Sequence, residues 1–288
     1  MLGSFWLGSV ALLADAAHNV SDGAAVGIAL VAASLSMRAA SGRRTFGWGR
    51  VEILAALVNG ITLLGLGILI AIEAIGRLGD PPDVQAPGVI AFGLAGVAVN
   101  GAAVIALLRA GSSRDDLNLH GALLHTIADV AGSAGVVMAG VLVAAFGWNE
   151  ADPVIALLVA VLCVGSARRL IAEPVRILLE RAPPHLDPEA IGRALCAVEG
   201  VREVHDVHAW TITSGFDAVS VHVIAAAATD QHALLHRLEE LLRTQFDVNH
   251  TTIQVDRDHR APLSIHRVGC PEAPKPRTAA PRLHEHNH

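Results

Sequence analysis

The chain has 288 residues, of which 52% are hydrophobic and only 17% are charged, and its formal net charge at pH 7 is −6. This apolar composition argues against an ordinary soluble protein and indicates a membrane protein. The sequence contains no block of basic residues, so nucleic acid is not an expected partner. The long apolar runs lie within residues 1–180, whereas most of the histidines follow residue 183.

Five apolar segments are long enough to cross a bilayer, which requires about 20 residues: 5–37, 51–75, 89–108, 121–146 and 153–170. Arginines are concentrated between the first two segments, between the third and fourth, and after the fifth. Because arginine-rich loops favour the cytoplasm, we expect five spans with the C-terminal part inside. This arrangement places residue 1 outside, and we therefore expect one more apolar helix of about 20 residues to be encoded upstream.

The region after the fifth apolar segment shows a different pattern. Residues 187–199 and 230–246 have the spacing of amphipathic helices, whereas VREVHDVHAWTIT, FDAVSVHVIAAA and HTTIQVD alternate as strands do. The order helix–strand–strand–helix–strand predicts a small α+β domain with a split, ferredoxin-like sheet. We therefore divide the chain into a transmembrane domain (1–180), a cytosolic domain (183–260) and a disordered Pro- and Ala-rich tail (261–288).

One polar motif occurs in two different apolar segments. The first segment contains His18 and Asp22, and the fourth contains His125 and Asp129. Residues four apart share one helix face, and ionisable groups inside a membrane are usually functional. If the two faces meet, their imidazoles and carboxylates would form a tetrahedral site for Zn²⁺, and Cd²⁺ or Co²⁺ could also bind. For either pair alone, a hydrogen-bonded structural couple is the alternative.

Three stretches of the sequence, GSVALLADAAHNVSD, RRTFGWGRVEILAALVNG and LHGALLHTIADVAGSAGVV, resemble signatures of the cation diffusion facilitator transporters. The resemblance is to their zinc-exporting bacterial branch and covers residues 8–256. It implies a multi-pass protein of the bacterial cytoplasmic membrane, embedded in the lipid bilayer as a homodimer, with its C-terminal domain in the cytosol. It also implies that His18, Asp22, His125 and Asp129 form the transport site, where metal is exchanged for protons.

The same resemblance extends to metal ligands in the cytosolic domain, which in this family often binds metal at its dimer interface. It implies His205, His222 and Asp256 as ligands. A further histidine position of some relatives is Gln254 here, and His250 is the candidate to replace it. The loop SGRRTFGWGR contains no His, Asp or Glu, so the additional loop site of some members is not expected.

We therefore expect a transporter, not an enzyme, that exports Zn²⁺ from the cytosol against protons and binds zinc as a possible regulatory ligand. Two alternatives stay open. A membrane-embedded zinc enzyme would need three protein ligands, an open coordination position and a general base, for which Asp15 is the nearest candidate. A non-transporting membrane metal sensor would bind the ion without moving it.

Overall fold

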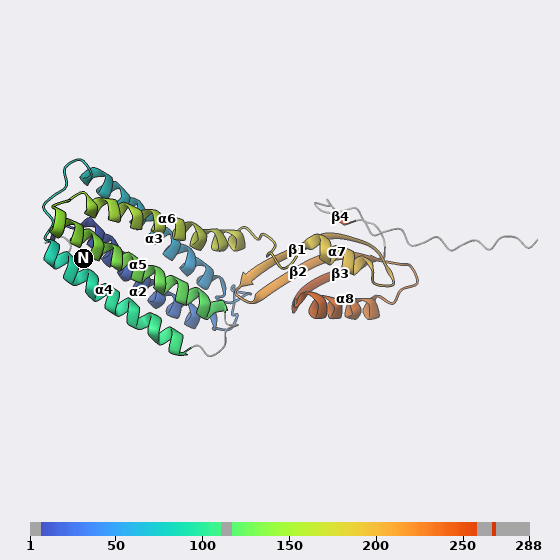
Figure 1. The fold of residues 1–288 in the computed structure, drawn as a ribbon. Coiled ribbons are helices and arrows are strands. Elements are labelled where there is room, and N and C mark those ends of the chain that lie inside the picture. Colours follow the sequence, from blue (N-terminus) through green and yellow to red (C-terminus); the bar gives the residue numbers. More distant parts are fainter. Residues whose placement is uncertain (1–6, 111–116, 258–266, 269–288) are drawn as a thin grey trace, which may run out of the picture. The chain divides into compact units, whose positions relative to one another are not determined.

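The computed structural model describes residues 7–110, 117–257 and 267–268. The chain divides into two compact units, Met1–Leu178 and Leu179–His288. The first unit consists of long helices, and the second combines helices with a sheet (Figure 1). The predicted fold class, a helical membrane part followed by an α+β domain, is therefore confirmed.

The described residues of the first unit contain five long helices, and these lie side by side as a bundle (Figure 1). All five are long and apolar enough to cross a membrane, in agreement with the predicted spans. Helix α3 packs against α6, α4 packs against α5, and α2 contacts both pairs. The helices are α2 (Val10–Ser36), α3 (Arg50–Arg77), α4 (Ala86–Ala110), α5 (Leu117–Phe146) and α6 (Ala151–Leu178).

Glycines allow the two helix pairs to pack closely. A Cβ atom at Gly60 of α3 would lie 2.8 Å from Cγ1 of Ile171 in α6, and one at Gly140 of α5 would lie 2.8 Å from Cγ1 of Ile90 in α4. Helices surrounded by lipid gain little from burying apolar surface against one another, so close backbone approach at small residues provides much of their attraction. The bundle is thus held by tight contacts between α3 and α6 and between α4 and α5.

The N-terminal end of α2 is fixed by side chains of two other helices. Ser9 is the N-cap residue of α2. Asp152 of α6 accepts hydrogen bonds from the Ser9 hydroxyl and, at 2.6 Å, from the Val10 N–H. Arg77 of α3 donates to the Gly8 carbonyl at 2.9 Å. A carboxylate is favourable at a helix N-terminus because the unpaired N–H groups there carry partial positive charge. These contacts fix where α2 starts relative to α3 and α6.

Helix α6 is longer than the sequence predicts, because it continues past residue 170 to Leu178 with Pro174 buried inside it. Hydropathy marks the part of a helix that is apolar enough for lipid, and it does not mark where the helix ends. Proline removes one backbone hydrogen bond from a helix interior, but α6 continues past Pro174 to Leu178.

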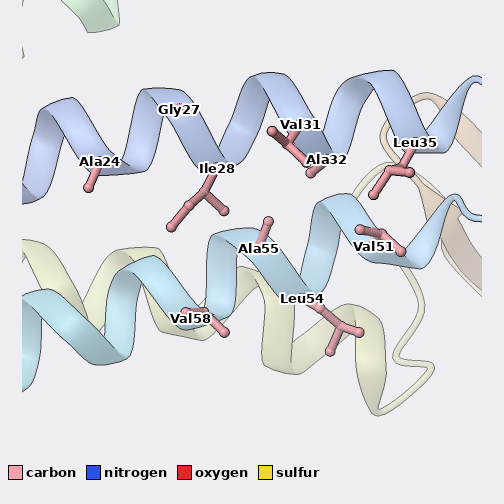
Figure 2. A pocket seen from close by; sticks show the side chains of 10 residues that line it. All are labelled: Ala24, Gly27, Ile28, Val31, Ala32, Leu35, Val51, Leu54, Ala55 and Val58. Atoms are coloured by element: carbon pink, nitrogen blue, oxygen red, sulfur yellow. The ribbon is translucent and has the colours of Figure 1, made fainter.

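An apolar groove lies between α2 and α3 (Figure 2). Its lining side chains contain no titratable group, so the groove offers no ligand to a metal ion. The lining residues are Ala24, Gly27, Ile28, Val31, Ala32, Leu35, Val51, Leu54, Ala55 and Val58.

The second unit contains a four-stranded sheet in the order β3-β2-β1-β4. Strands β1 and β2 are antiparallel, and β3 is parallel to β2. The helices begin at aspartate caps, Asp187 for α7 and Asp230 for α8, each of which accepts backbone N–H bonds from the first turn. The elements are α7 (Pro188–Cys196), β1 (Val201–Thr213), β2 (Phe216–Ala225), α8 (Gln231–Phe246), β3 (His250–Asp256) and β4 (Arg267–Val268).

One face of this sheet is packed against the two helices. Val204 and Val223 are paired across β1 and β2 and are buried in a core that also contains leucines of α7 and α8. Neighbouring residues of a strand point to opposite faces, so the next pair, His205 and His222, lies on the other face. The core thus positions both histidines together.

Strand β4 differs from the prediction that residues 261–288 form a disordered tail. Arg267 and Val268 pair with His205 and Val204 on the edge of β1. An edge strand has unpaired N–H and C=O groups that another segment can bind, and composition alone does not reveal this. The histidine-containing end of the predicted tail lies outside the described residues.

Candidate metal centre

The two His-x-x-x-Asp faces of α2 and α5 meet inside the bundle. His18 Nε2 lies 3.3 Å from Asp129 Oδ1, and His125 Nε2 lies 3.4 Å from Asp22 Oδ2. Within each helix, the corresponding nitrogen–oxygen distances are 3.6 Å on α2 and 3.9 Å on α5. Each imidazole therefore faces a carboxylate of its own helix and a carboxylate of the other.

The two distances between α2 and α5 match the spacing of ligands around a tetrahedral ion. Ligands bound to Zn²⁺ at about 2.0–2.1 Å are about 3.3–3.4 Å from one another in a tetrahedron. Ligand atoms of His18, Asp22 and Asp129 lie within 4.8 Å of one another. Asp129 Oδ1 is buried and accepts no hydrogen bond, although an imidazole nitrogen is close. The cluster thus has the donor atoms and the spacing for a small divalent cation.

The cluster is more open on one side than on the other. The side chain of Asp129 is 12% exposed and that of His18 is 17% exposed, whereas that of His125 is 56% exposed. Behind His18, the Cys163 sulfur of α6 lies 4.0 Å from Nδ1. His18 therefore presents Nε2, and not Nδ1, to the two carboxylates.

Asp15 belongs to a neighbouring cluster of hydrogen bonds nearer the start of α2. Its buried carboxylate accepts from the Ser133 hydroxyl at 3.0 Å and from the Asn19 amide at 3.3 Å. Asn100 of α4 donates to the same Ser133 oxygen at 3.4 Å. These bonds connect α2, α4 and α5 beside the His–Asp cluster, and they hold the two ligand-bearing helices together.

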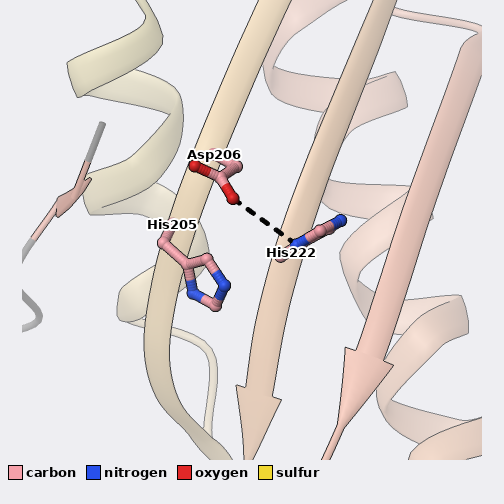
Figure 3. Close-up of side chains that lie close together, drawn as sticks. All are labelled: His205, Asp206 and His222. Carbon is pink, nitrogen blue, oxygen red and sulfur yellow. Dashed lines mark ion pairs between the residues drawn. The ribbon is translucent and has the colours of Figure 1, made fainter. Parts of the chain in front are cut away.

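A second cluster of ligand-type side chains lies on the face of the sheet opposite the core in the C-terminal unit (Figure 3), and His205 in this cluster is only 3% exposed. His222 Nδ1 is 3.6 Å from Asp206 Oδ2. The His205 and His222 rings are perpendicular, with centroids 5.3 Å apart. One ligand atom from each of these three residues lies within 4.8 Å of the others, which is close enough to share one cation.

The sequence did not predict Asp206 as a member of this cluster, because regular alternation places it on the face opposite His205. The structure has an irregularity in β1 between His205 and His208, and Asp206 has a φ of 52°. A β-bulge inserts one residue into the strand and redirects its side chain. Aspartate is among the few residues that tolerate this left-handed conformation. The bulge places the carboxylate beside His222.

His250 and Asp256 do not join this cluster. In the parallel pairing of β2 with β3, Gln254 lies opposite His222, and His250 lies opposite Ala218. Four residues along a strand correspond to about 13 Å, so His250 is too far from His222 to share an ion with it. Asp256 lies opposite Ile224 and accepts a hydrogen bond from Gln254 at 2.6 Å. Metal binding by His250 or Asp256 stays a prediction.

Comparison with known families covers nearly the whole chain. Residues 1–179 match the cation efflux transmembrane domain, and residues 183–258 match the cytoplasmic domain of cation efflux proteins. The chain belongs to the cation efflux family. The predicted resemblance to the cation diffusion facilitators is therefore confirmed, as are an integral membrane location, a cytoplasmic C-terminal domain and a transporter rather than an enzyme.

Several bacterial proteins are similar to this cation efflux protein over most of their length. It is 36% identical to a cadmium, cobalt and zinc/H(+)-K(+) antiporter of Bacillus velezensis over 258 residues, 88% of this chain and 82% of the relative. It is 38% identical to the zinc transporter ZitB of Escherichia coli over 259 residues, 89% and 82% of the two chains. It is 34% identical to the metal cation efflux system protein CzcD of Cupriavidus metallidurans over 257 residues, 89% and 81%.

Proposed function

We propose that this cation efflux protein exports Zn²⁺ from the cytosol in exchange for protons, and that His18, Asp22, His125 and Asp129 bind the ion during transport. The observation that carries the proposal is the meeting of two identical His–Asp pairs, with nitrogen–oxygen distances of 3.3 and 3.4 Å between α2 and α5. A single His–Asp pair could be structural, but two facing pairs leave each imidazole beside two carboxylates.

The ligand set supports zinc as the main cargo. Two nitrogens and two carboxylate oxygens in a tetrahedral arrangement are typical ligands of Zn²⁺. Cd²⁺ and Co²⁺ accept the same donor atoms, since the order of affinities alone does not select one metal. The names of the relatives include zinc, cadmium and cobalt. We therefore expect zinc to be preferred and the other two to be transported as well.

Proton coupling follows from competition for the same ligand atoms. Imidazole binds a metal only when neutral, and carboxylate binds it when ionised, so metal loading releases protons and protonation weakens metal binding. If the site opens to the two sides of the membrane in turn, a proton gradient can then drive zinc outward. The B. velezensis relative is itself named as an antiporter of metals with protons and potassium ions.

We further infer that two copies of the chain assemble in the lipid bilayer. Support comes from the five apolar helices, which are long enough to span it. The C-terminal match is to a domain named for dimerisation. The His205–Asp206–His222 cluster belongs to that domain, where bound zinc would regulate how two copies approach each other.

A flux experiment in proteoliposomes tests this function. Vesicles that contain a zinc-sensitive dye and the full chain should accumulate zinc faster when their interior is more acidic than the outside. Asp129→Asn should abolish uptake, because it removes one charged ligand. Asp83→Asn, a change at an exposed loop carboxylate, is the matched control and should transport normally. A rate of zinc uptake that does not depend on the proton gradient would contradict antiport. Zinc binding without any uptake would favour a membrane metal sensor.

A further inference from the structure

A pair of histidines on helix α8 belongs to neither cluster described above. His232 and His236 are both exposed and lie four residues apart, so they share one face of the helix. Their Nε2 atoms are 3.3 Å apart. The ring centroids are separated by 4.6 Å, with 78° between the ring planes. The two nitrogens therefore converge on one point above the surface of the cytoplasmic domain.

The separation of these nitrogens equals that of two ligands on one metal ion. Two nitrogens bound to tetrahedral Zn²⁺ at about 2.0–2.1 Å are about 3.3–3.4 Å apart. Two histidines four residues apart on a helix chelate zinc in proteins of other classes. Helix α8 is continuous from Gln231 to Phe246 and is capped by Asp230. The backbone thus places both imidazoles on one face of α8, where their Nε2 atoms lie at this spacing.

Glu239 supplies the outer partner that metal-binding histidines commonly have. Its Oε2 atom lies 3.4 Å from His236 Nδ1. A histidine that binds a metal through one nitrogen usually donates the N–H of the other to a carboxylate or carbonyl, which fixes the tautomer. Here the carboxylate favours a proton on Nδ1, and His236 then offers the lone pair of Nε2 on the side of His232.

We propose that His232 and His236 form a two-ligand site for Zn²⁺ and similar cations on the cytoplasmic domain, with water at the other coordination positions. Because protein atoms fill only two positions, the ion binds more weakly and exchanges faster than at a site with four protein ligands. Nitrogen ligands should bind Cu²⁺ and Ni²⁺ more strongly than Co²⁺ here. The site rests on α8 alone and does not depend on the direction or the proton coupling of transport.

Equilibrium dialysis of the full chain in detergent against Zn²⁺ tests the proposal. Asp129→Ala and His222→Ala first remove the other two candidate sites, and the three histidines of the C-terminal hexapeptide LHEHNH are changed to alanine. This background chain should still bind one zinc ion. His232→Ala or His236→Ala should remove that ion. Glu239→Gln should weaken its binding by about tenfold or more.

Two control variants separate chelation from the mere presence of histidines. Gln231→His combined with His232→Ala keeps the number of histidines but places them five apart, about 140° around the helix, and it should not bind the ion. His185→Ala removes another exposed imidazole, which lies 2.8 Å from Asp217, and should leave binding unchanged. Zinc binding by His232→Ala or by the Gln231→His, His232→Ala variant would overturn the proposal. The contact between His232 and His236 would then be only a hydrogen bond between two imidazoles.

Discussion

Replacing Asp152 with alanine should destabilise the helical bundle at the start of α2. The carboxylate is 1% exposed and accepts hydrogen bonds from the Ser9 hydroxyl and the Val10 N–H. Ser9 is 2% exposed and Val10 is fully buried, so water cannot replace the lost acceptor without rearrangement. Alanine would therefore leave these two buried donors without partners, and it would also remove the oxygen that the Ala11 N–H approaches at 3.4 Å.

The size of the effect can be estimated for alanine and for asparagine separately. A buried donor without a partner costs about 1–3 kcal/mol, so Asp152→Ala should lower the free energy of unfolding by about 2–6 kcal/mol. Asparagine keeps one oxygen for the Val10 N–H, and its amide can donate to the Ser9 oxygen. Only the benefit of the charge is then lost, about 1 kcal/mol. A change of 1 kcal/mol in the free energy of unfolding shifts the midpoint temperature of thermal unfolding by about 2–4 °C in a domain of this size.

Thermal unfolding in detergent, followed by reaction of a maleimide dye with the Cys163 thiol, measures both shifts. Cys163 is 4% exposed in the bundle and is the free cysteine among the described residues, so its reaction reports the unfolding of the bundle. The expected decrease is about 5–20 °C for Asp152→Ala and about 2–4 °C for Asp152→Asn. Asp83→Asn, whose carboxylate has an exposed 3.5 Å contact with Asn149, should change little. Equal midpoints for the alanine and asparagine variants would refute the reasoning.

Three further predictions concern the metal ligands. Alanine at any one of the four proposed transport ligands should abolish zinc tolerance in export-deficient cells, and near-normal tolerance for any two at matched expression would contradict a tetrahedral site. His18→Asp exchanges a nitrogen for a harder oxygen and should relax the preference toward Mn²⁺ or Cd²⁺; an unchanged ranking in competitive vesicle uptake would show that His18 does not contact the ion. In a chain without the transport ligands, zinc should stabilise the cytoplasmic domain against heat. His222→Ala or Asp206→Ala should remove most of the zinc-dependent increase in the midpoint temperature of unfolding, and His208→Ala should not. The full increase in His222→Ala would exclude the His205–Asp206–His222 cluster as the zinc site.

The transmembrane part of the candidate site could be predicted because its determinants are local. Hydropathy identifies α2 and α5, and a spacing of four places His18 with Asp22, and His125 with Asp129, on one face of each helix. The contact between α2 and α5 is not local, and it could be anticipated only because two matching sets of ligands imply a common ion. The Cys163 sulfur behind His18 comes from α6, and the sequence contains no pattern that relates these two residues.

The cytoplasmic cluster was predicted less completely, for reasons that concern strand pairing. His205 and His222 alternate correctly with the buried valines, so their common face follows from the sequence. Asp206 depends on a bulge that forms only when β1 pairs with β2. His250 was expected to replace the histidine that some relatives have at the position of Gln254, but the parallel register places His250 opposite Ala218, four residues from His222. Register arises from the packed sheet, and the isolated strand does not specify it.

Helix α2 is fixed to the rest of the bundle mainly at its N-terminal end. Its buried residues lie between Val10 and Ala17, apart from Ala32, and Asp152 holds the same end. His18 is about 12 Å along the axis from Val10, and Ser36 is about 39 Å away. Any tilt of α2 about its fixed N-terminal end therefore displaces Ser36 about three times as far as His18. The proposed ligands His18 and Asp22 lie close to the fixed end of α2, so a tilt of the helix moves them less than it moves residues near Ser36.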